Sequence, residues 1–418
     1  MSFSLAILRL RDFRALLLTR MLLIMALQTQ AVIVGWQVYS LTHDPFILGL
    51  TGLAEALPAI TCALFAGHIV DISRPHRVYL VSLGVLTLNT FALLLLAGGL
   101  AEAPFGVVPC IFAGVFVSGI ARSFVMPSSF SLLPQVVPRE KIPAASACMS
   151  GGFQIAAIIG PAMAGVVYGG YGPRVAWLMP VTLIALAFII FAGMSATHRH
   201  YRSAEKREPA VKSILTGWRF IIHNRVLLSV MTLDMFAVLF GGAVAMLPAY
   251  ADQVLHLGSQ GLGMLRAAPA VGAMATALFL ATRPLKHIRA TLLLAVVTGF
   301  GLSMIGFGLS HVFALSALFL ILSGAFDSCS MVIRGSLMQL LTPDAMRGRV
   351  SAVNSMFIIS SNEIGAFESG LAARFFGLIP SIVLGGIGTL IVVALIGGLS
   401  PKLRRLVVDS GAAQKASK

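Results

Sequence analysis

Long apolar stretches recur along the whole chain, and twelve of them are long enough to cross a lipid bilayer, which takes about 20 helical residues. Of the 418 residues, 58% are hydrophobic and only 11% are charged. A water-soluble protein cannot cover that much apolar surface with so few charges. The sequence therefore predicts an all-α membrane protein and excludes a water-soluble enzyme. The expected spans cover residues 15–41, 46–70, 78–100, 105–132, 143–168, 174–196, 224–250, 260–282, 290–310, 312–341, 350–376 and 379–399.

The formal net charge of +15 comes from basic residues that lie on one side of the predicted membrane. With the amino terminus in the cytoplasm, most of the 30 Lys and Arg residues fall in cytoplasmic segments. This bias predicts that both termini are cytoplasmic, and it is compatible with a bacterial inner (plasma) membrane. It also explains the basic character without a nucleic-acid partner.

Motifs of enzyme chemistry are missing from the sequence. It contains no phosphate-binding loop, no His-Glu-x-x-His and no nucleophile elbow, and the four cysteines have no metal-ligand spacing. We therefore expect no enzyme activity, cofactor or metal. Because no nucleotide-binding motif is present, active transport by this chain has to draw on an ion gradient.

An internal repeat relates the two halves of the chain. A shift of 205 positions places residues 119–165 on 324–370 without a gap, and a shift of 211 aligns Pro58 with Pro269. Chance matching in a chain rich in Gly and Ala is the alternative, but the unbroken order and the matching spans argue against it. The sequence thus predicts two pseudo-symmetric six-helix bundles, an architecture of secondary transporters.

One long hydrophilic stretch separates the two halves and defines the expected domains. We predict a first bundle over residues 1–196, a cytoplasmic linker over 197–223, a second bundle over 224–400 and a cytoplasmic tail over 401–418.

Two stretches resemble the macrolide-efflux and enterobactin-exporter branch of the major facilitator superfamily. The fourth and fifth helices of that branch resemble GIARSFVMPSSFSLLPQVVPREKIPAASA and the following IIGPAMAG. Its tenth-to-eleventh helix junction resembles LMQLLTPDAMRGRVSAVNSMF. The resemblance covers nearly the whole chain. It implies a twelve-helix transporter in which helices 1, 4, 7 and 10 line a cavity and helices 3, 6, 9 and 12 face lipid.

The resemblance also implies a gating motif in the loop after the second helix, which usually reads Gly-x-x-x-Asp-Arg. Here the loop carries Gly67 and Asp71, with Ile72 in place of the usual basic residue. Arg74 and Arg77 follow.

A Gly-Pro motif in the fifth helix is the second family element, and it consists of Gly152, Gly160, Pro161 and Gly165. The resemblance to proton-coupled exporters of the family implies that this motif acts as a hinge and a site of tight helix packing. Small residues allow helices to approach closely, and Pro161 removes one backbone hydrogen bond. Simple helix packing without a role in coupling is the alternative.

Charged side chains inside the spans are candidates for function, because each costs a few kcal/mol or more in apolar surroundings. They avoid the third, sixth, ninth and twelfth spans except near the ends of those spans. We therefore expect them to surround a shared aqueous path. The set comprises Arg20, Glu55, Arg122, Asp234, Arg266, Asp327, Arg334, Glu363 and Glu368.

The repeat places opposite charges at equivalent positions. Arg122 is equivalent to Asp327, and Glu55 is equivalent to Arg266. We expect ion pairs between the halves that hold one access state closed and break in the other. Permanent structural pairs are the alternative.

Three carboxylates lie nearer the middle of their spans. A carboxyl group kept away from water can exchange a proton near neutral pH, as proton coupling requires. We predict Glu363 as the first coupling residue and Asp234 as the second, followed by Glu368. Structural hydrogen bonding is the alternative. Asn362 makes the same span more polar, where it can bind substrate or contact neighbouring helices.

Side chains near the ends of spans have a simpler expected role. We expect Arg20 and Arg334 to extend to the membrane surface, and Trp36, Tyr39 and Tyr250 to lie at the membrane interface. Tyr39 and Tyr250 at matching repeat positions can instead frame an outer gate.

Taken together, these features predict a secondary active transporter that alternates between inward-open and outward-open states by rocking its halves. Proton-coupled export of an amphipathic drug or siderophore-like molecule is the leading hypothesis, with the direction implied by the resemblance. A facilitator or importer of a small solute, and a receptor or assembly subunit without flux, are the alternatives. The expected partners are a small-molecule substrate, protons and the lipid bilayer, and we expect a monomer.

Overall fold

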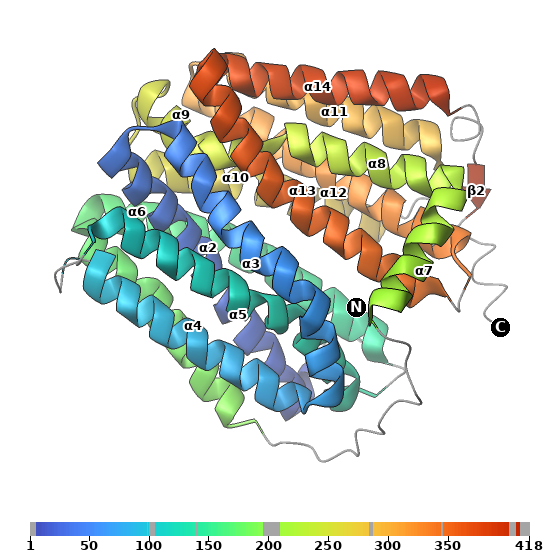
Figure 1. Cartoon of the computed structure of the whole chain (residues 1–418), viewed down its shortest axis with the longest axis horizontal. Coiled ribbons are helices and arrows are strands. Elements are labelled where there is room, and N and C mark those ends of the chain that lie inside the picture. Colours follow the sequence, from blue (N-terminus) through green and yellow to red (C-terminus); the bar gives the residue numbers. More distant parts are fainter. Residues whose placement is uncertain are drawn as a thin grey trace. The chain divides into compact units, whose positions relative to one another are not determined.

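The computed structural model describes residues 6–97, 99, 105–138, 141–194, 210–283, 287–343, 346–400 and 407–409, with some side chains in these ranges left out. The chain forms two compact units, each built almost entirely of helices (Figure 1). Unit 1 comprises residues 1–43, 53–210 and 257–267, and unit 2 comprises 44–52, 211–256 and 268–418.

Unit 1 contains the amino-terminal helices, and its core lies among α2, α4, α5 and α6. In it α2 packs along α6, and α4 packs against α5. Leu16, Leu83 and Phe191 are fully buried in this core. The elements are η1 (Ala6–Arg9), α2 (Arg11–Thr42), α3 (Pro45–Ile72), whose first turns belong to unit 2, α4 (Pro75–Ala97), α5 (Val107–Val136) and α6 (Ile142–Ala192).

The long helix α6 is two helices joined at a sharp break. Gly172 has φ 77° and ψ 179°, a backbone conformation that a residue with a Cβ rarely adopts. Pro173 follows and starts the second helix, because proline fits the first helical position. The break lies between the predicted spans 143–168 and 174–196.

Unit 2 contains the carboxyl-terminal helices, with α11 packed against both α12 and α14 (Figure 1). Val230, Leu293 and Ile333 are fully buried in its core. The elements are α7 (Ala210–His223), α8 (Arg225–Phe240), η3 (Gly242–Met246), α9 (Leu247–Gln253), α10 (Ser259–Thr282), whose first turns belong to unit 1, α11 (Ala290–Leu309), α12 (Phe313–Leu341), α13 (Arg347–Phe376) and α14 (Leu378–Leu399).

The predicted span 224–250 is interrupted within unit 2. α8 ends at Phe240, eight residues before Pro248, and the chain continues as η3 and α9. Gly242 lies against α13, where an added Cβ would come within 2.6 Å of the Gly365 carbonyl oxygen. Close backbone contact therefore accompanies the break. Pro248 lies in the first turn of α9, where a proline leaves no helical hydrogen bond unmade.

Part of the predicted linker is an amphipathic helix. α7 occupies the last residues of the segment 197–223, and residues 195–209 lie outside the described part. Ile221 packs with Met231, Val350 and Val353 in a small apolar cluster. Asn224 then starts α8, because its side chain accepts a hydrogen bond from the backbone N–H of Leu227 at 3.2 Å.

A short antiparallel sheet joins the connection after α10 to the carboxyl-terminal tail. β1 (His287–Arg289) pairs with β2 (Val407–Asp409), and Ile288 lies opposite Val408. Nothing in the sequence had led us to expect this pairing.

Helix length agrees with the predicted membrane topology. In the described part of the chain, nine helices are long and apolar enough to cross a membrane. One of them is the double helix α6, and α3 and α13 stand where the remaining predicted spans were expected. The structure is therefore an all-α membrane fold consistent with twelve spans in two six-helix bundles.

Three predictions about span ends are wrong. Tyr39 and Tyr250 are 1% and 0% exposed, so they lie inside the protein and not at a membrane interface. The Tyr250 hydroxyl donates to the Phe307 carbonyl at 2.6 Å. Arg334 does not extend to a membrane surface either, because it is 7% exposed and its guanidinium is paired within unit 2.

Candidate functional site

Unit 1 contains an ion pair between two of the predicted residues. The guanidinium of Arg122 in α5 pairs with the carboxylate of Glu55 in α3. Their side chains are 41% and 25% exposed, so the pair reaches the surface of unit 1. The structure brings the two residues together within one half, in a combination that we did not predict. The predicted pairing of each with a residue of the other half stays a prediction.

Close contact between α3 and α5 makes this ion pair possible. Gly119 lies about one turn before Arg122, and an added Cβ there would come within 2.7 Å of the Glu55 carbonyl oxygen. A larger residue would push the two helices apart. Ser123 donates to the Gly119 carbonyl at 2.9 Å within α5. The glycine thus sets the helix spacing at which a guanidinium and a carboxylate can meet.

Unit 2 contains a second ion pair, and this one is buried. Asp234 in α8 pairs with Arg334 in α12, and their side chains are 8% and 9% exposed. Charges out of water are tolerated when they are paired, and removing one partner leaves an uncompensated charge. Protonation of Asp234 would have the same effect, because it removes the negative charge that compensates Arg334.

The repeat relates this pair to a weaker contact in unit 1. Ser129 is the repeat equivalent of Arg334, and it accepts a hydrogen bond from the Arg20 guanidinium at 3.3 Å. In each half, a polar contact thus joins the first span to the fourth span. In unit 1 the cation lies on α2, whereas in unit 2 it lies on α12.

The other predicted site residues lie in α10, α12 and α13. Asp327 and Glu368 are half-buried, and Asn362 is exposed and donates to the Ile358 carbonyl at 2.9 Å. The side chain of Glu363 lies outside the described residues, although its backbone is part of α13. Arg266 lies in the first turns of α10, within unit 1.

The glycine motif of α6 packs against two other helices of unit 1. A Cβ at Gly152 would come within 2.8 Å of Met21 Cγ, and one at Gly160 within 2.8 Å of the Met25 carbonyl oxygen, both in α2. The Gly160 carbonyl also accepts a hydrogen bond from Thr29 at 3.3 Å. Pro161 lies in the helix directly after Gly160.

Two glycine contacts follow the repeat. An added Cβ at Gly165 would come within 2.8 Å of Gly263 Cα, in the first turns of α10 within unit 1. Its repeat equivalent Gly370 would come within 2.8 Å of Gly49 Cα, in the first turns of α3 within unit 2. Both contacts require glycine, since any side chain would meet backbone atoms of the facing helix.

The residues of the predicted gating motif lie in the last turns of α3 and the first turn of α4. The backbone of Gly67 and Asp71 is part of α3, and their surroundings lie outside the described part. Arg77 is exposed in the first turn of α4. The gating role that the family motif implies for these residues stays a prediction.

Sequence reasoning missed a buried polar cluster in unit 1. The Asn89 amide donates to Ser118 Oγ at 2.9 Å, and the Gln30 amide donates to the same oxygen at 3.3 Å. Two turns further along α2, Gln37 accepts a hydrogen bond from Trp177 at 2.9 Å. The signal was available in the sequence, because Gln30 and Gln37 are two turns apart in an apolar span.

Comparison with known proteins agrees with this geometry. The family model described as "Major Facilitator Superfamily" matches residues 16–366. The enterobactin exporter EntS of Citrobacter koseri is 26% identical over 395 residues, which cover 94% of this chain and 92% of that protein. The enterobactin exporter EntS of Escherichia coli O1:K1 / APEC is also 26% identical, with the same coverage.

Solved structures show the same fold. A crystal structure of the nucleoside transporter NupG matches with a TM-score of 0.72 at 11% identity, covering 93% of this chain and 99% of that one. A POT family transporter in complex with a thioalcohol-conjugated peptide matches with a TM-score of 0.73 at 12% identity, covering 94% of this chain and 97% of that one.

Proposed function

The chain belongs to the Major Facilitator Superfamily, and we propose that it is a proton-coupled exporter of an amphipathic organic molecule. As a superfamily member it is a multi-pass membrane transporter of a small molecule and not an enzyme. The proposal adds the driving ion, the direction and the class of substrate. It further includes alternating access by rocking of the two six-helix halves, with both termini in the cytoplasm.

The buried pair of Asp234 and Arg334 is the observation that carries the proton coupling. The ion pair joins α8 to α12. When it forms or breaks, the attraction between these two helices changes. A single proton on the carboxylate breaks it and leaves Arg334 unpaired. A transporter can use this step to link proton uptake to a change of conformation. Glu363 and Glu368 remain further candidates for carrying the proton.

Relatives support the direction and the class of substrate. The proteins of known function quoted above are named as enterobactin exporters. An identity of 26% supports a shared class of transport. We therefore propose an amphipathic organic molecule of the drug or siderophore type and use enterobactin as the first probe.

Purified protein in liposomes with an imposed pH gradient tests the proposal. Adding enterobactin, or an amphipathic dye, is expected to move protons, as recorded by a pH-sensitive fluorophore in the lumen. Glu363→Gln is expected to abolish this proton movement while leaving thermal unfolding unchanged. Asp252→Asn, outside the ion pair at the end of α9, serves as the control.

Three results would speak against the proposal. Substrate flux that is indifferent to the pH gradient indicates a facilitator. Absence of flux for every probe, with binding retained, indicates a receptor. If the Glu363→Gln variant and an Asp234→Asn/Arg334→Gln double variant both move protons normally, the coupling residues lie elsewhere.

A further inference from the structure

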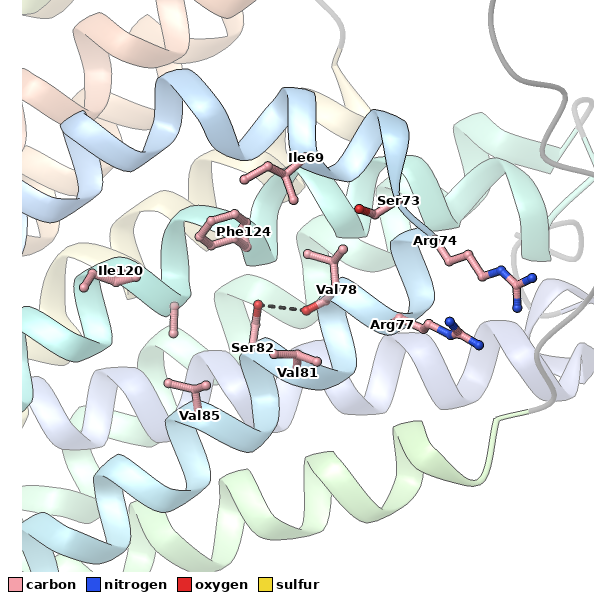
Figure 2. Close-up of a pocket in the computed structure, with 11 residues that line it drawn as sticks. Ile69, Ser73, Arg74, Arg77, Val78, Val81, Ser82, Val85, Ile120 and Phe124 are labelled. Carbon is pink, nitrogen blue, oxygen red and sulfur yellow. Dashed lines mark hydrogen bonds between the residues drawn. The ribbon is translucent and has the colours of Figure 1, made fainter.

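A cavity of about 740 Å³ lies in unit 1 between the end of α3, the start of α4 and the middle of α5 (Figure 2). Its size falls within the range of pockets that hold a drug-sized ligand, about 300–1,000 Å³. Ile120, Ala121 and Phe124 of its wall flank Arg122 in α5, but neither Arg122 nor Glu55 is among its described lining residues. Ile69 in the cavity wall lies fourteen residues after Glu55 in α3, which is about 20 Å along a helix.

The wall of the cavity is apolar. It consists mainly of the side chains of Ile69, Val78, Val81, Val85, Ile120 and Phe124. Ser82 also lies there, but its hydroxyl donates to the Val78 carbonyl at 2.9 Å and is therefore satisfied within α4. The wall offers an occupant hydrocarbon contact and little hydrogen bonding.

The open side of this wall is suited to acyl chains. After Arg77, α4 carries no charged residue up to its end at Ala97. Val81 and Leu88 are 64% and 72% exposed, so the outer face of α4 is apolar. In a chain that spans a membrane, such a face lies against lipid, because exposing this apolar surface to water would cost free energy.

Two arginines lie at one end of the cavity. Figure 2 shows Arg74 and Arg77 at the same end, beyond the apolar side chains. Both are exposed, and within the described residues neither forms an ion pair with a carboxylate. They flank the amino terminus of α4, where the helix dipole adds positive charge. Guanidinium groups bind phosphate oxygens in a two-pronged geometry.

We propose that this cavity binds one anionic phospholipid of the cytoplasmic leaflet. Its acyl chain lies along the α4–α5 wall, and its phosphate binds Arg74 and Arg77. The side of the membrane follows from the bias of basic residues, which predicts that the α3–α4 connection is cytoplasmic. We expect a lipid with net negative charge to bind better than a zwitterionic one. The two arginines have no described carboxylate partner, so the positive charge of a zwitterionic headgroup would be repelled by them.

Native mass spectrometry of the delipidated protein tests this lipid site. Phosphatidylglycerol and phosphatidylcholine with identical acyl chains are added separately, and the wild type is expected to bind phosphatidylglycerol more tightly. Arg74→Gln/Arg77→Gln is expected to reduce this preference by about fivefold for each arginine removed. Arg283→Gln/Arg289→Gln is the matched control, since it removes the same charge from the corresponding connection of the second half.

A second pair of variants tests the apolar wall while keeping both arginines. Val81→Phe fills the cavity and is expected to weaken the binding of both lipids. Leu88→Phe, on the outer face of α4 beyond the cavity, is expected to leave binding unchanged. Thermal unfolding of each variant shows whether it is folded.

Several outcomes would overturn the lipid proposal. One is an unchanged lipid preference in the folded Arg74→Gln/Arg77→Gln variant, and another is an equal loss in the control. Displacement of phosphatidylglycerol by inorganic phosphate at equal concentration would assign the arginines to a soluble anion. Unchanged lipid binding by Val81→Phe would exclude the cavity itself.

Discussion

Each of the two ion pairs joins one arginine to one carboxylate, and the sequence did not show which residues would pair. The repeat identified Glu55 and Arg122 as important positions, and the structure pairs them with each other within unit 1. Repeat equivalence tells which positions correspond, but it does not tell which faces of neighbouring helices meet. The contact depends on Gly119, which lets α3 and α5 approach closely enough.

Exchanging the charges of the exposed pair tests its role. Arg122→Glu places two carboxylates together, and we expect transport to fall sharply, while Glu55→Arg/Arg122→Glu regains part of it. Because both side chains are partly exposed, the loss of stability from either single change should stay within about 1 kcal/mol. Flux and thermal unfolding measured on the same samples separate the two effects. Equal loss in the single and double variants would show that pairing is not what matters.

The buried pair should respond differently. Asp234→Asn leaves the Arg334 charge buried without its partner, and we expect a loss of about 3–5 kcal/mol in unfolding free energy. Asp234→Leu/Arg334→Met removes both charges and should recover most of that stability, because a well-packed apolar pair replaces the ionic one. Denaturation in detergent measures both. If the double variant is no more stable than Asp234→Asn, the pair is not the source of the loss.

At the scale of helices, the apolar runs predicted the element order well, but breaks inside a run were harder to place. Gly172 interrupts α6 between two predicted spans, where the apolar pattern also weakens. The break after α8 lies instead within a continuous apolar run, and Gly242 is there because α13 approaches closely. A contact between distant segments leaves no local pattern, so the position of this break could not be predicted from the sequence.

Close packing of α6 on α2 depends on some of the glycines in α6 and not on others. Gly160→Ala forces a Cβ against the Met25 carbonyl, and we expect a loss of about 1–3 kcal/mol in stability. Gly151→Ala in the same helix meets nothing within 4 Å and should be neutral or slightly stabilising. Melting temperatures of the two variants provide the comparison. The packing argument fails if Gly160→Ala is as stable as Gly151→Ala.

The whole molecule was the most predictable level. Hydropathy, the repeat and the resemblance together indicated two pseudo-symmetric bundles, and the fold and family agree with that. The placement of the site was less predictable. Nine charged residues within the spans could be named from the sequence. The side chain of Glu363 lies outside the described part, and the partner of Asp234 is known only from the structure.

Membrane orientation is a whole-molecule prediction that labelling can check. In a variant with Cys62, Cys110, Cys148 and Cys329 replaced by Ser, we expect Phe105→Cys to react with an impermeant maleimide from outside intact cells. Arg283→Cys should react only after the cells are opened, because basic connections remain cytoplasmic. Both positions are exposed, so reactivity reports the side of the membrane. The reverse pattern would invert the topology, and with it the leaflet assigned to the lipid site.

Pairing of β1 with β2 has a practical consequence for anyone who attaches a reporter to this protein. Since Val407–Asp409 is hydrogen-bonded to the connection between α10 and α11, this stretch near the carboxyl terminus is fastened to unit 2. A fluorophore fused there would follow the movements of the second bundle. Truncating the chain before Val407 would remove this strand and leave the edge of His287–Arg289 open to pairing with other strands.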